Sequence, residues 1–290
     1  MKPAPFSYHR PGSLSQALAL LGEHGAEAKL LAGGQSLVAM LNMRLARPAH
    51  LIDLNDLVEL DSLRRDGPVI EIGALTRHHR LATAPELRRE LPLLAGAAAT
   101  IGHYAIRQRG TIGGSLVHAD PAAQLPLVAV TLDAEVVIAG PRGHRRVPAA
   151  DFLQSVMTVD LAPDEIVVAL RVPVQPPEAL WDFQLFSRRH GDFALVSVAL
   201  SLACDADGRI AALQLGLGGV DAVPVRMKEV EAMAAGRPFD EGTMAELAAA
   251  AAAAIAPEDT PQVPADYRRE LAESLVLRAL RRALEPRSAA

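Results

Sequence analysis

The stretches Ala32-Gly33-Gly34-Gln35-Ser36 and Thr111-Ile112-Gly113-Gly114-Ser115 decide how this 290-residue chain is interpreted. Each places a Gly-Gly pair shortly before a serine, and an apolar residue follows (Leu37 and Leu116). Without Cβ atoms, such a pair lets backbone N–H groups point into one concavity and approach a ligand closely. The serine hydroxyl adds a hydrogen-bond donor for phosphate oxygens. The two motifs therefore predict a pair of loops that hold a diphosphate between them.

The composition is typical of a globular protein and excludes several classes of function. Half of the residues are apolar, 22% are charged and the net charge is −5, so the protein has no general attraction for nucleic acid or anionic lipid. Aromatic residues make up only 3%, which also argues against a base-stacking surface. The single cysteine, Cys204, excludes an internal disulfide, a cysteine-rich zinc site and a self-contained iron–sulfur cluster. We expect no nucleic-acid partner.

The hydropathy pattern predicts neither a membrane span nor a signal peptide. No uninterrupted apolar run approaches the ~20 residues that a bilayer requires. The first ten residues contain Pro3, Pro5, Tyr8 and His9, where a signal peptide needs an apolar stretch. We therefore expect a cytoplasmic protein.

Strands and helices are expected to alternate over the first part of the chain. Ser13 is a candidate N-cap for a helix that ends near Gly25. A strand over 29–31 leads into the first motif and a helix over 36–45 follows it, an arrangement that aims backbone donors at an anion. Periodicity predicts further strands over 50–54, 69–73, 134–139, 144–147 and 165–172, and helices over 76–83, 85–89, 92–100 and 121–130.

A proline-rich segment predicts a domain boundary near residue 177. Pro173, Pro176 and Pro177 interrupt regular structure there. Beyond them, strands are expected over 181–188, 196–203 and 211–217, and helices over 226–235, 241–255 and 265–284. The second domain is therefore expected to be a small antiparallel sheet with a few helices.

The chain resembles the FAD-binding medium subunits of molybdenum hydroxylases, of the carbon monoxide dehydrogenase and xanthine dehydrogenase type. Six fingerprints in order along the chain carry this resemblance: Ala32-Gly33-Gly34-Gln35-Ser36-Leu37, Leu51-Ile52-Asp53-Leu54, Gly73-Ala74-Leu75-Thr76, Arg109-Gly110-Thr111-Ile112-Gly113-Gly114-Ser115-Leu116, His118-Ala119-Asp120-Pro121, and Arg188-Arg189-His190-Gly191-Asp192-Phe193-Ala194. Any one of them is modest evidence, whereas all six in the right order are specific.

The resemblance implies an α+β fold like that of the vanillyl-alcohol-oxidase (PCMH-type) flavoproteins. Residues 1–177 would form an FAD-binding domain of two α/β subdomains, split near 55–60. Residues 178–290 would form a C-terminal domain of the carbon monoxide dehydrogenase flavoprotein type, with an antiparallel sheet and helices.

The resemblance also implies an oxidoreductase in which this chain is one of three subunits, usually assembled as a dimer of heterotrimers. A large subunit would carry molybdopterin and oxidise the substrate, and a small subunit would carry two [2Fe–2S] clusters. This chain would take electrons from the clusters onto non-covalently bound FAD and pass them to an external acceptor. The substrate stays open among carbon monoxide, an aldehyde, a purine and another N-heterocycle.

Transferred position by position, the resemblance assigns cofactor-binding residues but no catalytic residue and no metal ligand. The diphosphate would lie at Ala32–Ser36 and Gly110–Ser115, flanked by Leu30, Leu31 and Leu37, with Ile101 and Gly102 near the cofactor. Ile166 and Val167 would contact the flavin's pyrimidine edge, and the turn with Asp192 and Phe193 would lie against the isoalloxazine. Gln124 replaces the acidic residue of most relatives, and Gln184 stands where many have a lysine.

Several side chains beside the motifs have more ordinary interpretations. His78 and His79, between Arg77 and Arg80, are expected on a solvated helix face, because adjacent helical residues diverge and chelate poorly. Arg107 and Arg109 would either offset diphosphate charge or lie at the surface. His118 and Asp120 are expected to shape the second motif through hydrogen bonds, and Cys204 to be a small buried residue.

Two other functions stay open. A stand-alone flavoprotein oxidoreductase would turn over its own organic substrate. A non-catalytic assembly subunit would have lost FAD, for which Gln124 and the missing lysine are the supporting features. A Rossmann domain is disfavoured because no G-x-G-x-x-G occurs at a strand–helix junction.

Overall fold

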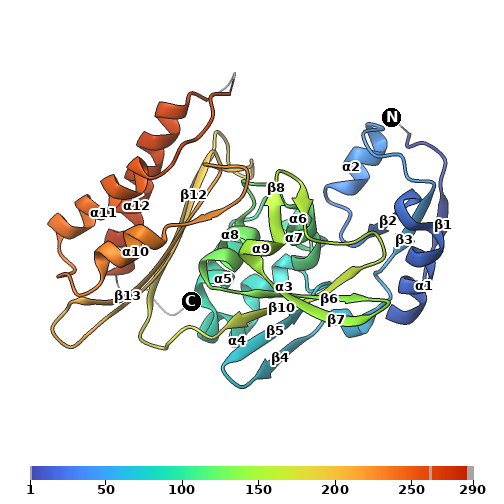
Figure 1. Ribbon diagram of the computed structural model, residues 1–290, viewed down its shortest axis with the longest axis horizontal. Coiled ribbons are helices and arrows are strands. Elements are labelled where there is room, and N and C mark those ends of the chain that lie inside the picture. The colour runs from blue at the N-terminus through green and yellow to red at the C-terminus, as the bar shows by residue number, and fades with distance from the viewer. Residues whose placement is uncertain (1, 261–262, 286–290) are drawn as a thin grey trace.

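The computed structural model describes residues 2–260 and 263–285. Three units follow one another along the chain and also across the molecule (Figure 1). We call them the N-terminal subdomain (β1 to β3), the central subdomain (β4 to β10) and the C-terminal domain (β11 to α12). In the described part of the chain, no helix has the length and apolar character needed to cross a membrane.

The N-terminal subdomain is a parallel sheet of strand order β1-β3-β2 with two helices. Its elements are β1 (Ser7–His9), α1 (Leu14–His24), the 3-10 turn η1 (Gly25–Glu27), β2 (Ala28–Leu31), α2 (Leu37–Asn42) and β3 (His50–Asp53). As predicted, the Ser13 hydroxyl caps α1 by accepting from the Gln16 N–H, and Gly25 ends the helix with a φ of 51°. Leu21 of α1 and Ile52 of β3 are buried in one cluster.

The central subdomain is built on an antiparallel sheet of strand order β4-β5-β10-β6-β7. Its strands are β4 (Leu63–Asp66), β5 (Val69–Gly73), β6 (Glu135–Gly140), β7 (Gly143–Pro148) and β10 (Ile166–Pro173). In β10, Val167 and Leu170 belong to the core formed with the helices, whereas Ile166 and Val168 belong to the core shared with the N-terminal subdomain. Burial on both faces explains why residues 166–170 of this strand are a continuous apolar run.

Helices cover the face of this sheet that does not pack against the N-terminal subdomain (Figure 1). Leu81, Leu93, Leu116 and Leu125, from four different helices, are fully buried there. The remaining elements of the subdomain are η2 (Val58–Leu60), α3 (His78–Thr83), α4 (Pro85–Glu90), α5 (Pro92–Ala99), α6 (Tyr104–Arg107), α7 (Ile112–His118), α8 (Gln124–Thr131), α9 (Ala149–Phe152), β8 (Leu153–Ser155) and β9 (Thr158–Val159).

The C-terminal domain is a four-stranded antiparallel sheet, β11-β12-β13-β14, with three helices on its outer face (Figure 1). Its elements are β11 (Leu180–Phe186), β12 (Val196–Cys204), β13 (Ile210–Gly218), β14 (Val225–Arg226), α10 (Lys228–Ala234), α11 (Glu241–Ala253) and α12 (Ala265–Ala283). Val198 and Leu200 of β12 pack with these helices, whereas Ala199 packs with the central subdomain. The alternation of apolar and small residues in 196–203 predicts a half-buried strand, but both faces of β12 are buried, one against each core.

The architecture is α+β, as predicted, but three local expectations were wrong. The second glycine motif lies in the first turn of α7, capped by Thr111, and not in a loop. Helix α2 ends at Asn42, earlier than expected. Strands β1 and β4 were not predicted, because three-residue β1 is too short for periodicity and β4 has the polar sequence Leu-Arg-Arg-Asp at the edge of its sheet.

A candidate cofactor site at the junction of the subdomains

The two glycine motifs lie close together where the N-terminal and central subdomains meet. A Cβ atom on Gly33 would overlap with the carbonyl oxygen of Arg109 and would lie 2.9 Å from the Cα of Gly110. A Cβ on Gly113 would lie 2.7 Å from the Cβ of Ala74. These glycines are thus required because protein segments approach each other closely. The expectation that they also allow close approach to a ligand stays a prediction.

An asparagine and an arginine connect the two motifs. The Asn55 side-chain amide donates to the carbonyl oxygen of Ala32 (2.9 Å). The Arg77 guanidinium donates to the side-chain oxygen of Asn55 (2.6 Å) and to the carbonyl oxygen of Arg109 (2.5 Å). We call this pair the Asn55–Arg77 clamp, because it joins the first motif to the residue directly before Gly110. Burial, with the nearby charge of Arg109, lowers the pKa of Arg77.

The buried carboxylate of Asp53 fixes one member of the clamp, Asn55, by a hydrogen bond. Asp53, at the end of β3, accepts from the Asn55 N–H (2.9 Å) and from the Tyr8 hydroxyl (2.5 Å). Burial raises the pKa of Asp53, but the hydrogen bonds from Tyr8 and Asn55 together outweigh it and hold the pKa below its ordinary value. The carboxylate is therefore ionised at neutral pH and fixes the position of Asn55.

The first motif supplies the backbone donors that an anion requires. In the described part of the chain, the N–H groups of residues 33–36 make no hydrogen bond to a protein acceptor. In the second motif, by contrast, Ile112 donates to the Thr76 carbonyl (3.1 Å), Gly113 to the Ala74 carbonyl (2.9 Å) and Gly114 to the Thr111 hydroxyl (3.1 Å). The expectation of backbone donors for an anion therefore stays a prediction for the first motif and is corrected for these three residues of the second.

The hydroxyls of Ser36 and Ser115 complete the polar lining. Both serines are half-buried, so they remain partly exposed to solvent. Ser36 is the N-cap residue of α2, and Ser115 lies in α7, whose first turn contains the second motif. The two motifs thus retain the hydroxyl donors that the sequence predicted at phosphate oxygens.

His78 lies under the second motif and is not on a solvated helix face, so that prediction was wrong. Its Nε2 lies 2.9 Å from the carbonyl oxygen of Thr111, and a Cβ on Gly110 would lie 2.7 Å from its ring. Burial, helped by the charges of Arg107 and Arg77, lowers the pKa of His78 to about 4. The ring is therefore neutral at pH 7, and Nε2 is the donor in this bond.

Ile101, Gly102 and the 191–193 turn form a second group of predicted site residues. Arg107 donates to the carbonyl oxygens of Ile101 (2.8 Å) and Gly102 (3.1 Å), which gives this arginine a structural role. A Cβ on Gly191, at a φ of 89°, would lie 2.5 Å from the ring of His103, so the 191–193 turn contacts the segment after Gly102. Phe193 in this turn is 60% exposed.

Asp192 and Phe193 also line a cavity of about 310 Å³ in the C-terminal domain. Leu195 and Arg268 contribute to its wall, and Arg268 donates to the carbonyl oxygens of Leu195 and Gly219. These hydrogen bonds from Arg268 fix the backbone just after the 191–193 turn to the C-terminal domain, while the Phe193 ring stays accessible.

The remaining apolar site residues flank the two motifs. Leu30 and Leu31 end β2, Leu37 begins α2, and Ile166 and Val167 begin β10. Ala74 couples β10 to the second motif, because its N–H donates to the Val168 carbonyl (2.9 Å) and its carbonyl accepts from Gly113.

Gln124 and Gln184 are both buried. Gln124 is the first residue of α8. Gln184 is paired with Val198 in the sheet, so both side chains face the helices of the C-terminal domain, and its amide donates to Asp182. The structure therefore does not bring Gln184 to the motifs, which corrects that assignment.

Sequence reasoning missed the residues that hold the site together. Asn55 and Arg77 directly follow the fingerprints Leu51–Leu54 and Gly73–Thr76, and His78 comes next. Their positions after two recognised fingerprints were the available signal. Their roles depend on contacts between residues far apart in the sequence, which no local pattern reveals.

Comparison with known proteins decides the family. Residues 4–175 match the family described as FAD binding domain in molybdopterin dehydrogenase, and residues 181–283 match the CO dehydrogenase flavoprotein C-terminal domain. The chain belongs to the FAD-binding medium subunits of molybdenum hydroxylases. It is thus an oxidoreductase subunit with an FAD-binding domain followed by a C-terminal domain of an antiparallel sheet and helices.

Relatives of this family match nearly the whole chain. The chain is 39% identical to the 6-hydroxypseudooxynicotine dehydrogenase complex subunit alpha of Paenarthrobacter nicotinovorans, covering 98% of this chain and 96% of the relative. A structure of carbon monoxide dehydrogenase from Hydrogenophaga pseudoflava superimposes with a TM-score of 0.93 at 37% identity, covering 98% of both chains. Quinoline 2-oxidoreductase from Pseudomonas putida 86 gives a TM-score of 0.93 at 34% identity, with 98% of both chains covered.

Proposed function

We propose that this medium subunit binds FAD non-covalently at the junction of its subdomains. In a molybdenum hydroxylase it would transfer electrons from the complex to an external acceptor. The observation that carries the proposal is the set of backbone N–H groups at 33–36 without a protein acceptor, held in place by the Asn55–Arg77 clamp. Such donors offset phosphate charge without a positive side chain. FAD, when bound, would supply the redox chemistry, since it accepts electrons from a donor cluster and passes them to an external acceptor.

The residues present fit this cofactor along its length. The N–H groups of 33–36, with the Ser36 and Ser115 hydroxyls, would hold the diphosphate. Ile101, Gly102, Ile166 and Val167 would flank the flavin ring, and Phe193 with Asp192 would lie against it. A 60% exposed aromatic ring is the kind of surface on which a planar ring stacks. The clamp acts by positioning the first motif and does not itself contact the reacting atoms.

We further propose that the chain assembles with a large molybdopterin subunit and a small subunit with two [2Fe–2S] clusters, as a dimer of heterotrimers. With Cys204 as its only cysteine, this chain cannot hold such a cluster by itself. The similar proteins are named for 6-hydroxypseudooxynicotine, carbon monoxide and quinoline, three unlike compounds, at 34–39% identity. This diversity supports a substrate pocket in the large subunit, outside this chain. The two family matches, over residues 4–175 and 181–283, support a division of the chain near 177 into cofactor and C-terminal domains.

Electron transfer from a reduced partner tests the proposal directly. The FAD-loaded chain is mixed with the dithionite-reduced small subunit in a stopped-flow instrument, and the flavin absorption is followed. We expect the flavin band to bleach with the reduced small subunit and to stay unchanged with the oxidised one. Turnover of an organic substrate by this chain alone would instead identify a stand-alone oxidoreductase. A co-expressed complex without FAD would identify an assembly subunit.

A further inference from the structure

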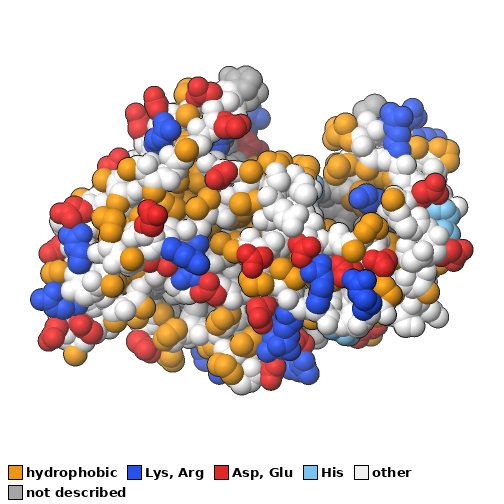
Figure 2. All heavy atoms as spheres, viewed as in Figure 1, with side chains coloured by type: hydrophobic (Ala, Val, Ile, Leu, Met, Phe, Trp, Pro, Cys, Tyr) orange, Lys and Arg blue, Asp and Glu red, His pale blue; other side chains and the backbone are white. Residues whose placement is uncertain are grey.

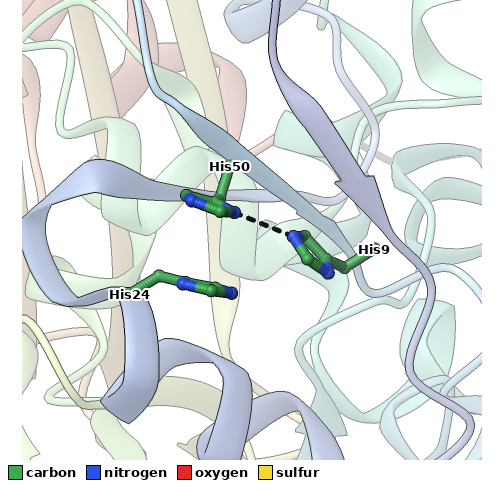
Figure 3. Close-up of side chains that lie close together, drawn as sticks. All are labelled: His9, His24 and His50. Atoms are coloured by element: carbon green, nitrogen blue, oxygen red, sulfur yellow. Dashed lines mark hydrogen bonds between the residues drawn. The ribbon is translucent and has the colours of Figure 1, made fainter.

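Three histidines from three elements meet on one face of the N-terminal sheet (Figure 3). His9 is the last residue of β1, His24 the last of α1 and His50 the first of β3. The Nε2 of His9 lies 2.9 Å from the Nδ1 of His50, and the rings of His24 and His50 are stacked with centroids 3.6 Å apart. One ring nitrogen of each histidine lies within 4.8 Å of the others.

The topology of the subdomain brings these side chains together. In the parallel β1–β3 pair, His9 is opposite Ile52, so the two side chains share a face of the sheet. His50, two residues before Ile52, shares that face. Helix α1 covers the same face through Leu21, and its last residue places His24 over His50.

We propose that His9, His24 and His50 bind one divalent transition-metal ion such as Zn²⁺. Zn–N bonds of about 2.0–2.1 Å in tetrahedral geometry place ligand nitrogens about 3.3 Å apart. The distance of 2.9 Å between the His9 and His50 nitrogens must therefore increase slightly. The His24 nitrogen, which lies within 4.8 Å of the other two, must move closer to them. In the metal-bound state the proton of the His9–His50 hydrogen bond moves through solvent to the other nitrogen of its ring.

One ring has to rotate before all three can bind the ion. A metal lies in the plane of each imidazole that binds it, whereas the planes of His24 and His50 are only 8° from parallel. His24 must therefore turn out of the stack. All three histidines are half-buried, and histidine atoms are visible on the surface of the N-terminal subdomain (Figure 2). There is therefore room for this rotation and a path for the ion.

The chemistry of the cluster selects the class of ion. Three neutral imidazoles favour Zn²⁺, Ni²⁺ or Cu²⁺ over Mg²⁺ and Ca²⁺, which prefer oxygen ligands. The cluster lies at the C-terminal end of the eleven-residue helix α1, where the helix dipole favours a cation. Three protein ligands leave one position for water. The bound ion would fasten β1 and α1 to β3, the strand that leads to Asp53 and the clamp.

Metal titration of the full chain, produced without a histidine tag, tests this site. Co²⁺ serves as the probe because its visible absorption reports its coordination, and Zn²⁺ is then added as a competitor. We expect one Co²⁺ per chain, displaced by Zn²⁺, and a higher melting temperature with either ion. Loss of a hydrogen-bond partner of a ligand already weakens metal binding about 10–100-fold, so His24→Ala and His9→Ala should each cost at least that much. His144→Ala removes an exposed histidine on β7 and should change nothing.

Several results would overturn the proposal. These are the absence of Co²⁺ binding, or binding that His144→Ala weakens as much as His24→Ala does. Because His9→Ala could disturb the edge strand, circular dichroism of each variant is recorded, and His24→Gln provides a second removal of the ligand at a helix end. The test does not involve FAD, so its outcome is independent of the proposed electron-transfer function.

Discussion

Gly33 and Arg109 belong to different subdomains, yet their backbones are so close that a Cβ on Gly33 would overlap with the Arg109 carbonyl oxygen. The same carbonyl accepts a hydrogen bond from Arg77, which in turn binds Asn55 and, through it, the first motif. The contact therefore sets the separation of the two motifs, and the clamp prevents them from opening.

We expect Gly33→Ala to destabilise the junction of the subdomains by about 1–3 kcal/mol, the usual cost of inserting a methyl group where backbone must move. Urea unfolding of the apo chain measures this cost. Gly22→Ala is the matched control, because a Cβ on Gly22 in α1 has nothing within 4 Å. It should stabilise the chain by about 0.5–1 kcal/mol, since alanine is the better helix former. Equal effects of the two substitutions would contradict the close contact at Gly33.

The Asn55–Arg77 clamp predicts energetic coupling between two residues. Asn55→Ala and Arg77→Ala each leave a partly buried partner unsatisfied, which costs about 1–3 kcal/mol. The double variant should lose less than the sum of the single losses, by at least about 0.5 kcal/mol. A double-mutant cycle of urea unfolding measures the coupling. Strict additivity would show that the hydrogen bond between them contributes nothing.

The buried histidine under the second motif makes stability depend on pH. The pKa of His78 is about 4 in the folded chain and 6.5 as its ordinary value, so below pH 6.5 the unfolded chain binds a proton that the folded chain does not. Stability contributed by the neutral ring is complete above pH 6.5 and falls as the pH drops toward 4, by up to about 3 kcal/mol. Unfolding of the wild type and of His78→Gln at pH 7 and pH 5 tests this. The variant should show the shallower loss, and parallel losses would contradict it.

The only tryptophan reports on the contact between the central subdomain and the C-terminal domain. A Cβ on Gly96 in α5 would overlap with the Trp181 ring, so Gly96→Ala should displace that ring. We expect a shift of tryptophan emission to longer wavelength in the folded variant and a loss of about 1–3 kcal/mol of stability. An unchanged emission spectrum with unchanged stability would show that the two surfaces are not packed at this point.

Much of the fold was predictable because its signals are local. The Ser13 cap, the strand over 196–203 and the hairpin over 134–147 each depend on residues near one another in sequence, and each prediction was confirmed. The alternation in 196–203 also predicted a half-buried strand, which was wrong, because both faces of β12 are buried. Strand β4 escaped because a charged edge strand carries no apolar pattern. The face toward which Gln184 points was also unpredictable, since it depends on which side of the sheet the C-terminal helices cover.

The site was predictable as a set of backbone motifs and not as a set of contacts. The glycine pairs and their serines were visible in the sequence, and the structure brings the two motifs together. Which N–H groups remain available was not visible, because Ile112 and Gly113 of the second motif donate to Thr76 and Ala74, which are far from them in the sequence. His78 looked solvent-exposed for the same reason: its surroundings come from residues thirty positions away, at Gly110 and Thr111.

Titration of the purified chain with FAD tests the central claim most directly, with flavin absorption and fluorescence as readouts. We predict one FAD per chain, binding weakened at least about tenfold by Gly33→Ala through displacement of the first motif, and no loss of binding in Gly22→Ala. If the chain fails to bind, the titration is repeated on the complex co-expressed with its partner subunits. FAD that binds equally well to Gly33→Ala, or no FAD in the chain or in the complex, would contradict the account.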